Sequence, residues 1–92
     1  MSNINKKVHA NFNAALFALS LERRGARPLH AQLTDGLREL LRAAPEAAGL
    51  RLPASRVLAE ELSVSRMTVT TAYDQLVAEG YLVTRQGGGT YV

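Results

Sequence analysis

Two short helical patterns separated by only two residues constrain this sequence more than any other feature does. The first pattern covers about residues 55–62, the break consists of Ser63 and Val64, and the second pattern runs from residue 65 to about residue 79. So short a break makes the two helices meet at a tight corner and share one core. Because the chain has only 92 residues, it has room for one small domain around this corner.

The strongest helical stripe in the chain precedes the corner. Leucine and alanine recur at spacings of three, four and one from Leu29 to Ala44, while polar side chains take the opposite face. Residues 45–49 end this helix, and residues 50–53 are predicted to form a short extended segment.

A weaker stripe near the N-terminus predicts a helix at about residues 11–21, capped by Asn11 or Asn13. Residues 1–9 are polar and aperiodic, so we expect a loose terminus there. The stripe consists of Phe12, Ala15, Leu16 and Leu19. Two alternatives remain for this helix: it packs on its own domain, or it is an arm that docks on a partner subunit.

Beyond the corner the pattern changes from helical to extended. Gly80 suits the left-handed position that follows a helix, and residues 81–85 and 90–92 are strand-like. Gln86 and three consecutive glycines join these two segments. The predicted fold is therefore mainly α with a small β-hairpin, a winged helix-turn-helix with a three-helix core and a wing.

Composition and charge exclude several function classes. The sequence has no cysteine and only two histidines, which leaves no thiolate nucleophile and too few ligands for a histidine-based metal cluster. An apolar stretch follows Lys6 and Lys7 as in a signal peptide, but no convincing cleavage site follows it, so we expect a cytoplasmic protein. No apolar run approaches the roughly 20 residues of a membrane span.

The net charge of +3 lies entirely in residues 1–48, whereas acidic and basic side chains balance in residues 49–92. If the C-terminal half binds a polyanion, its basic side chains must therefore lie on one face and its acidic side chains on another.

The residues around the corner suit a helix-turn-helix motif. Ala59 provides a small side chain where the helices cross, and Ser63 is compact enough for the turn. Ser65 is predicted to cap the second helix, while Val69 and Ala72 turn inward. The side chains left to point outward are Arg66, Met67, Thr68, Thr70 and Thr71. The second helix of such a motif fits the major groove of DNA.

Four segments resemble the DNA-binding domain of the GntR family. They are residues 27–33 (RPLHAQL), 52–69 (LPASRVLAEELSVSRMTV), 72–82 (AYDQLVAEGYL) and 84–92 (TRQGGGTYV). The resemblance covers residues 27–92 and leaves residues 1–26 as an N-terminal arm. Within the family, the LPxSR form and the AYxQLxAEGY run are most similar to the MocR subgroup.

This resemblance implies contacts with double-stranded DNA from both helices of the corner. Arg56 matches the family's arginine that reaches DNA from the first helix, although pairing with Glu60 one turn later is an alternative. Arg66 is the candidate to contact a guanine edge with two hydrogen bonds. Ser65 and Thr68 are expected to hold phosphates through their hydroxyls and the helix N-terminus.

The same resemblance implies contacts from the wing. Arg85 is expected to anchor the wing to a phosphate. The glycines that let the wing approach the backbone at the minor groove, or that simply form the turn, are Gly87, Gly88 and Gly89.

The sequence departs from the family pattern at four positions. Ala54 replaces a serine that usually caps the first helix of the corner, so Ser55 is expected to take over that cap. Ser63 stands where glycine is common, which predicts either strain or a turn that is not left-handed. The recognition helix often carries a basic residue where this chain has Thr70 and Thr71, which can contact phosphate or a thymine methyl.

The resemblance also implies a larger assembly. Regulators of the MocR subgroup join this domain to an aminotransferase-like domain of fold type I that binds pyridoxal phosphate. The only lysines here are Lys6 and Lys7, so no cofactor is expected in this chain and pyridoxal phosphate is implied for the full-length protein. We therefore expect an isolated N-terminal domain.

The predicted function is sequence-specific DNA binding that regulates transcription. The operator would have two half-sites, and the full-length protein would be a homodimer. The alternative is a winged-helix module for protein–protein interaction, in which the hairpin and the stripe of Phe12, Leu16 and Leu19 contact another protein. No catalytic constellation is present in the sequence, so no enzyme is expected.

Overall fold

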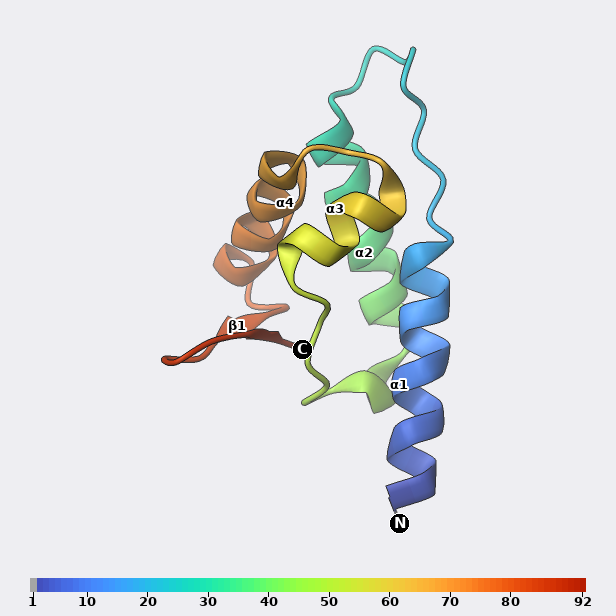
Figure 1. Ribbon diagram of the computed structural model, residues 1–92, viewed down its shortest axis with the longest axis vertical. Helices are drawn as coiled ribbons and strands as arrows, with labels where there is room; N and C mark the ends of the chain where they lie inside the picture. Colours follow the sequence, from blue (N-terminus) through green and yellow to red (C-terminus); the bar gives the residue numbers. More distant parts are fainter. Residues whose placement is uncertain (1) are drawn as a thin grey trace.

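Helices account for most of the chain in the computed structural model, which describes residues 2–92, with side chains from residue 6 onward (Figure 1). Its elements in chain order are α1 Ser2–Phe17, α2 Leu29–Ala43, the 3-10 helix η1 Pro45–Ala47, α3 Ser55–Leu62, α4 Arg66–Ala78, β1 Val83–Thr84 and β2 Thr90–Tyr91. This order confirms the predicted fold, mainly α with a C-terminal hairpin.

The N-terminal helix differs from its prediction in extent. α1 begins at Ser2 and ends at Phe17, so the prediction of a loose terminus followed by a helix over residues 11–21 is wrong. Residue 1 lies outside the described residues. Asn11 and Asn13 lie inside the helix, and neither caps it. The first turns of α1 are polar and lack an apolar period, which is the signal on which the prediction relied.

The apolar side of α1 packs on its own domain, as the first alternative had it. Phe12 is 5% exposed and Leu16 is fully buried in a core shared with the other helices. α1 contacts α2, η1 and α3, and the ring of His9 is hydrogen-bonded to the carbonyl of Arg51 at 3.1 Å. Phe12 and Leu16 are therefore not available to a partner, which removes two of the three stripe residues on which the interaction-module alternative depended.

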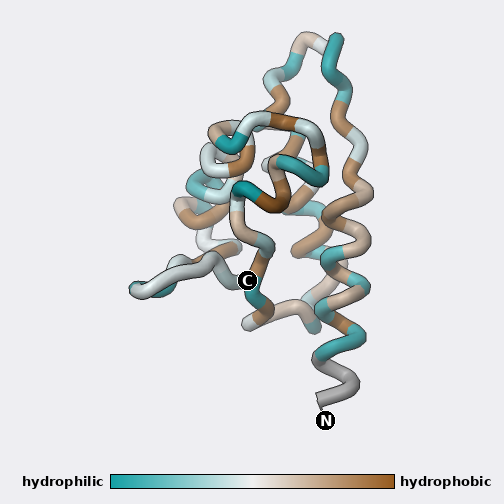
Figure 2. Tube along the Cα trace, viewed as in Figure 1, coloured by the Kyte–Doolittle hydropathy of each residue, from teal (hydrophilic) through white to brown (hydrophobic). Residues whose placement is uncertain are grey.

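Most of the rest of the core comes from the inward stripes of α2, α3 and α4. Leu33, Leu58 and Leu76, one from each helix, are fully buried. Tyr73 lies over this core, and its hydroxyl donates a hydrogen bond to the carbonyl of Pro53 at 2.8 Å. Burial raises the pKa of this phenol. In Figure 2 apolar residues recur along the helices, whereas the tip of the hairpin is pale to teal.

The corner between α3 and α4 turns at Ser63 in a left-handed conformation, with φ 55° and ψ 46°. The amide of Val64 donates to the carbonyl of Ala59 at 2.9 Å and so caps the end of α3. A left-handed backbone costs a non-glycine residue about 1–2 kcal/mol. The expectation of strain at Ser63 is therefore confirmed, and the alternative of a turn that is not left-handed is wrong.

Replacing Ser63 with glycine is expected to raise the free energy of unfolding by about 0.5–1 kcal/mol, because glycine has no Cβ to clash there. The matched change Ser65→Ala in the same turn is expected to lower it by about 1 kcal/mol, because it removes a helix cap. Urea denaturation of both variants measures the two effects. A less stable Ser63→Gly variant would show that the turn is not strained.

The strands of the C-terminal hairpin are shorter than predicted, and a third extended segment pairs with β2. β1 pairs with β2 in antiparallel register, with Val83 opposite Tyr91. On the other side of β2, Leu52 donates to the carbonyl of Thr90 and Val92 donates to that of Leu50, each at 2.8 Å. The extended segment before α3 therefore holds the base of the wing against the core.

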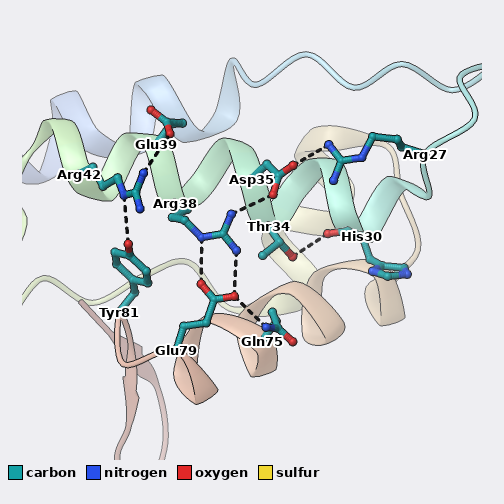
Figure 3. A network of polar contacts seen from close by, with 10 residues as sticks. All are labelled: Arg27, His30, Thr34, Asp35, Arg38, Glu39, Arg42, Gln75, Glu79 and Tyr81. Atoms are coloured by element: carbon teal, nitrogen blue, oxygen red, sulfur yellow. Dashed lines mark hydrogen bonds and ion pairs between the residues drawn. The ribbon is translucent and has the colours of Figure 1, made fainter.

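A polar network joins α2 to the C-terminal end of α4 (Figure 3). Arg38 donates two hydrogen bonds to the carboxylate of Glu79, at 2.9 and 2.8 Å, and a third to Asp35. The hydrogen bonds from Arg38 lower the pKa of Glu79 below its ordinary value of 4.5. Hydrogen bonds from Arg27 and then Arg38 lower the pKa of Asp35. The network fixes the end of α4 from which the wing departs.

The lowered pKa of Glu79 predicts a pH dependence of stability. A carboxylate whose folded pKa is depressed stabilises the fold above its ordinary pKa of 4.5, and this contribution is lost as the pH falls through the folded pKa. Glu79→Gln should therefore show a smaller drop in Tm than the wild type between about pH 6 and about pH 3. Glu61→Gln, at an exposed position on α3, is the control and should follow the wild type. Parallel curves for all three proteins would contradict the role of Glu79.

Candidate nucleic-acid interface

The outer side of α4 forms one surface with the start of α3 and the hairpin. α4 packs its inner stripe on α2 and α3, and the hairpin projects sideways beyond its C-terminal end (Figure 1). Among the described residues, no group of three or more histidine, cysteine or acidic side chains is arranged to hold a metal ion.

The first turn of α4 is built by a side-chain cap. The Oγ of Ser65 accepts a hydrogen bond from the amide of Thr68 at 3.0 Å and lies 2.9 Å from the Thr68 hydroxyl. This confirms Ser65 as the N-cap. Both hydroxyls stand beside the helix N-terminus, where the helix dipole favours an anion. Their contact with phosphate stays a prediction.

Arg66 is the basic residue at the start of the recognition helix. It is exposed, and its Nε donates to the Oγ of Ser55 at 3.1 Å, which links the first residues of α4 and α3. The prediction that Ser55 caps α3 is wrong: Ala54 occupies the cap position without a side-chain hydrogen bond, and the Ser55 hydroxyl accepts from Arg66 instead. The hydrogen bond leaves both Nη groups of Arg66 available for a bidentate contact.

The outward face of α4 beyond Arg66 carries little charge. Met67 is 75% exposed, and the hydroxyl of Thr70 donates to the Met67 carbonyl at 3.1 Å. Thr70 borders the groove toward the wing, whereas Thr71 borders a second groove, between α2 and α4. The two threonines therefore flank the exposed Met67 rather than forming one contact point.

Arg56 lies in the first turn of α3 and is exposed. In the part of the chain that the structure describes, it forms no ion pair with Glu60 or any other carboxylate. The alternative of an Arg56–Glu60 pair is therefore not seen. Arg56 and Arg66 lie in the first turns of the two helices of the corner, and the hydrogen bond from Arg66 to Ser55 brings these two turns together.

The wing tip depends on its glycines. The backbone φ values of Gly87, Gly88 and Gly89 are 89°, 128° and 97°, which only glycine adopts without strain. The turn therefore needs these residues, and the same lack of side chains leaves the tip open to a close approach. Arg85 is oriented by Tyr91, whose ring centroid lies 4.6 Å from the guanidinium carbon. Its contact with phosphate stays a prediction.

One basic residue at this surface was missed by the sequence analysis. Arg51 lies outside the helix-turn-helix motif in an extended segment, where no local signal marks it. Its backbone bridges Tyr91, and its guanidinium lies 6.0 Å from the centre of the Tyr91 ring. Only this tertiary pairing with the wing brings Arg51 to the surface.

These features define the class of the protein: a helix-turn-helix corner followed by a β wing is a winged helix-turn-helix domain. Comparison with known proteins gives the family. Residues 29–92 match the model of the bacterial regulatory proteins of the gntR family. The chain belongs to this family, and its domain is of a regulatory type rather than an enzyme.

Proteins of similar sequence are also regulators. The chain is 50% identical over 74 residues to the probable rhizopine catabolism regulatory protein MocR of Rhizobium meliloti, covering 80% of this chain and 15% of the relative. It is 49% identical over 61 residues to the pyridoxine biosynthesis transcriptional regulator PdxR of Corynebacterium glutamicum, covering 66% and 14%. The chain thus spans about one seventh of the length of these regulators.

Solved structures agree as well. YtrA from Sulfolobus acidocaldarius, a GntR-family transcription factor, superimposes with a TM-score of 0.73 at 32% identity, over 79% of this chain and 77% of that chain. The DNA-binding domain of AraR in complex with operator ORX1 superimposes with a TM-score of 0.70 at 28% identity, over 80% and 95%. The α1 helix precedes the residues that match the family model.

Proposed function

We propose that this domain binds a specific operator in double-stranded DNA and thereby regulates transcription. The observation that carries the proposal is α4 itself, which begins with a capped N-terminus and the exposed Arg66 and leads at its other end into a glycine-tipped wing. α4 enters the major groove, and the wing follows the backbone at the minor groove. The similarity to the AraR domain, which was solved on its operator, supports the same partner.

We expect the operator to contain two half-sites. One domain of this size buries only about 600–1,000 Å2 on DNA, which gives weak binding on its own. Two linked copies bind much more tightly, because the second contact becomes intramolecular. A homodimer is therefore part of the proposal.

The proposal extends to a longer protein by likeness to the MocR and PdxR regulators, of which this chain matches about one seventh. Pyridoxal phosphate would bind in an aminotransferase-like domain of that protein, where a lysine forms the covalent link. The residues of this chain do not fit the cofactor, because its only lysines, Lys6 and Lys7, are exposed on α1. Pyridoxal phosphate is therefore assigned to no residue of this chain.

The proposed cellular location follows from the partner, because a regulator that binds an operator acts in the cytoplasm, where the DNA is. None of the helices in the described part of the chain is long and apolar enough to cross a membrane.

Selection of bound duplexes from a random DNA library tests the function directly. We expect enrichment of paired half-sites, with an affinity for the best site that falls as salt is added. If the single chain enriches nothing, two copies joined by a flexible linker are expected to restore selection. Failure of the tethered protein to enrich any sequence would contradict operator binding.

A further inference from the structure

Arg51 is held at the base of the wing by its backbone. It lies in the segment that borders β2, between the paired residues Leu50 and Leu52, and forms an antiparallel bridge with Tyr91. Its carbonyl is also hydrogen-bonded to His9 of α1. Backbone contacts on both sides fix the direction in which the side chain leaves the strand.

The guanidinium of Arg51 lies against the wing, and its positive charge is not paired with a carboxylate among the described residues. It stands 6.0 Å from the centre of the Tyr91 ring, and Arg85 stands 4.6 Å from the same centre. A Cβ on Gly89 would come within 2.9 Å of the Arg51 Nε, so the glycine leaves the space that the arginine fills. Arg51 is exposed, and among the residues that the structure describes no carboxylate forms an ion pair with it.

The side chain borders a groove of about 260 Å3 between three elements. Gly89 and Thr90 of the wing form one wall, Ala54 and Ser55 at the start of α3 form another, and Thr70 of α4 lies opposite. Each of these elements faces DNA in the proposed function. A backbone strand that passes between α4 and the wing must therefore run along this groove.

From this geometry we infer that Arg51 is a further DNA-contacting residue, which binds a backbone phosphate of the strand between α4 and the wing. The inference rests on the proposed function and deepens it. A guanidinium binds phosphate with two parallel hydrogen bonds. The nearby Tyr91 ring and the space left by Gly89 order the side chain before DNA arrives, so less conformational entropy is lost on binding. The site is at the rim of the groove, away from the outward face of α4, and so contributes affinity rather than base preference.

The charges around the groove agree with this role. Asp74 of α4 is the acidic residue that lines it, and its carboxylate repels a passing phosphate. Arg51 is the cation that lines the same groove and offsets this repulsion. Arg85, which directly follows β1, lies over the same tyrosine ring, so both guanidinium groups lie near Tyr91.

The test uses the whole 92-residue chain and the duplex that it selects from a random library. Binding is measured by fluorescence anisotropy from about 50 to about 200 mM salt for the wild type and Arg51→Gln. We expect a roughly tenfold weaker affinity at the low end and a slope of log affinity against log salt that is smaller by about 1. Arg24→Gln, which removes one exposed arginine from the linker, controls for net charge and should keep the wild-type slope.

A second measurement separates a phosphate contact from a merely structural effect on the wing. Neutral methylphosphonates are placed one at a time along the half-site. The wild type should lose affinity at one phosphate where Arg51→Gln loses none, while both proteins respond equally at the others. Arg51→Lys, which keeps the charge but not the planar fork, should keep the salt slope and bind less tightly than the wild type.

The outcomes distinguish the two proposals. A wild type that selects DNA, together with an Arg51→Gln variant of unchanged salt slope and unchanged methylphosphonate profile, would overturn the role of Arg51 and leave operator binding intact. A wild type that selects no DNA, even when tethered, would overturn both.

Discussion

Replacing Arg66 with alanine is expected to abolish the preference for one base pair in each half-site. A bidentate contact between an arginine and a guanine edge discriminates against other bases by about 1–3 kcal/mol, which corresponds to roughly a fivefold to 150-fold difference in affinity. Arg66 is exposed on the first turn of α4, and its hydrogen bond to Ser55 holds the guanidinium beside the start of α3. Selection from a random library with the variant, compared base by base with the wild type, measures the loss.

Arg66→Lys is the matched control for charge. Lysine keeps the positive charge but lacks the planar fork, so we expect it to retain part of the nonspecific affinity and to lose most of the base preference. Thermal unfolding should change little in either variant, because the side chain is exposed and one surface hydrogen bond contributes only about 1 kcal/mol. If Arg66→Ala keeps the full base preference and binds all sequences less tightly, Arg66 contacts phosphate and the guanine prediction is wrong.

Local signals predicted the helix-turn-helix correctly. Ser65 caps α4 and Gly80 adopts a positive φ of 87° after it, as a helix start and a helix end require. Val69 and Ala72 of α4 are also buried, as predicted. Each of these features depends on residues within one or two turns, so the pattern alone contains the information.

Features that depend on distant contacts were not predictable in the same way. Arg51 becomes part of the surface because its strand pairs with β2, forty residues later in the chain. Ser55 would be a helix cap from its position alone, but Arg66 from the next helix takes its hydroxyl as an acceptor. Both partners, β2 for Arg51 and Arg66 for Ser55, come close only when the chain has folded.

The N-terminal helix shows the same limit, and its packing predicts a large effect on stability. Leu16 is fully buried where α1 meets the rest of the core, although α1 lies outside the residues that match the gntR family model. Leu16→Ala removes three buried side-chain carbons and leaves a cavity, which lowers the free energy of unfolding by about 2–5 kcal/mol. A domain of this size has a free energy of unfolding of about 5–14 kcal/mol, so the loss is a large fraction of the total.

Urea and thermal denaturation of Leu16→Ala measure this effect, and we expect Tm to fall by more than about 10 °C. Ala14→Gln, an exposed position in the same helix, is the matched control and should change the free energy of unfolding by less than about 0.5 kcal/mol. An unchanged Tm for Leu16→Ala would mean that α1 is not part of the folded unit in solution. A large loss would instead show that the domain extends beyond the boundary of its family, because the core that positions the recognition helix is closed by residues that the family model does not contain.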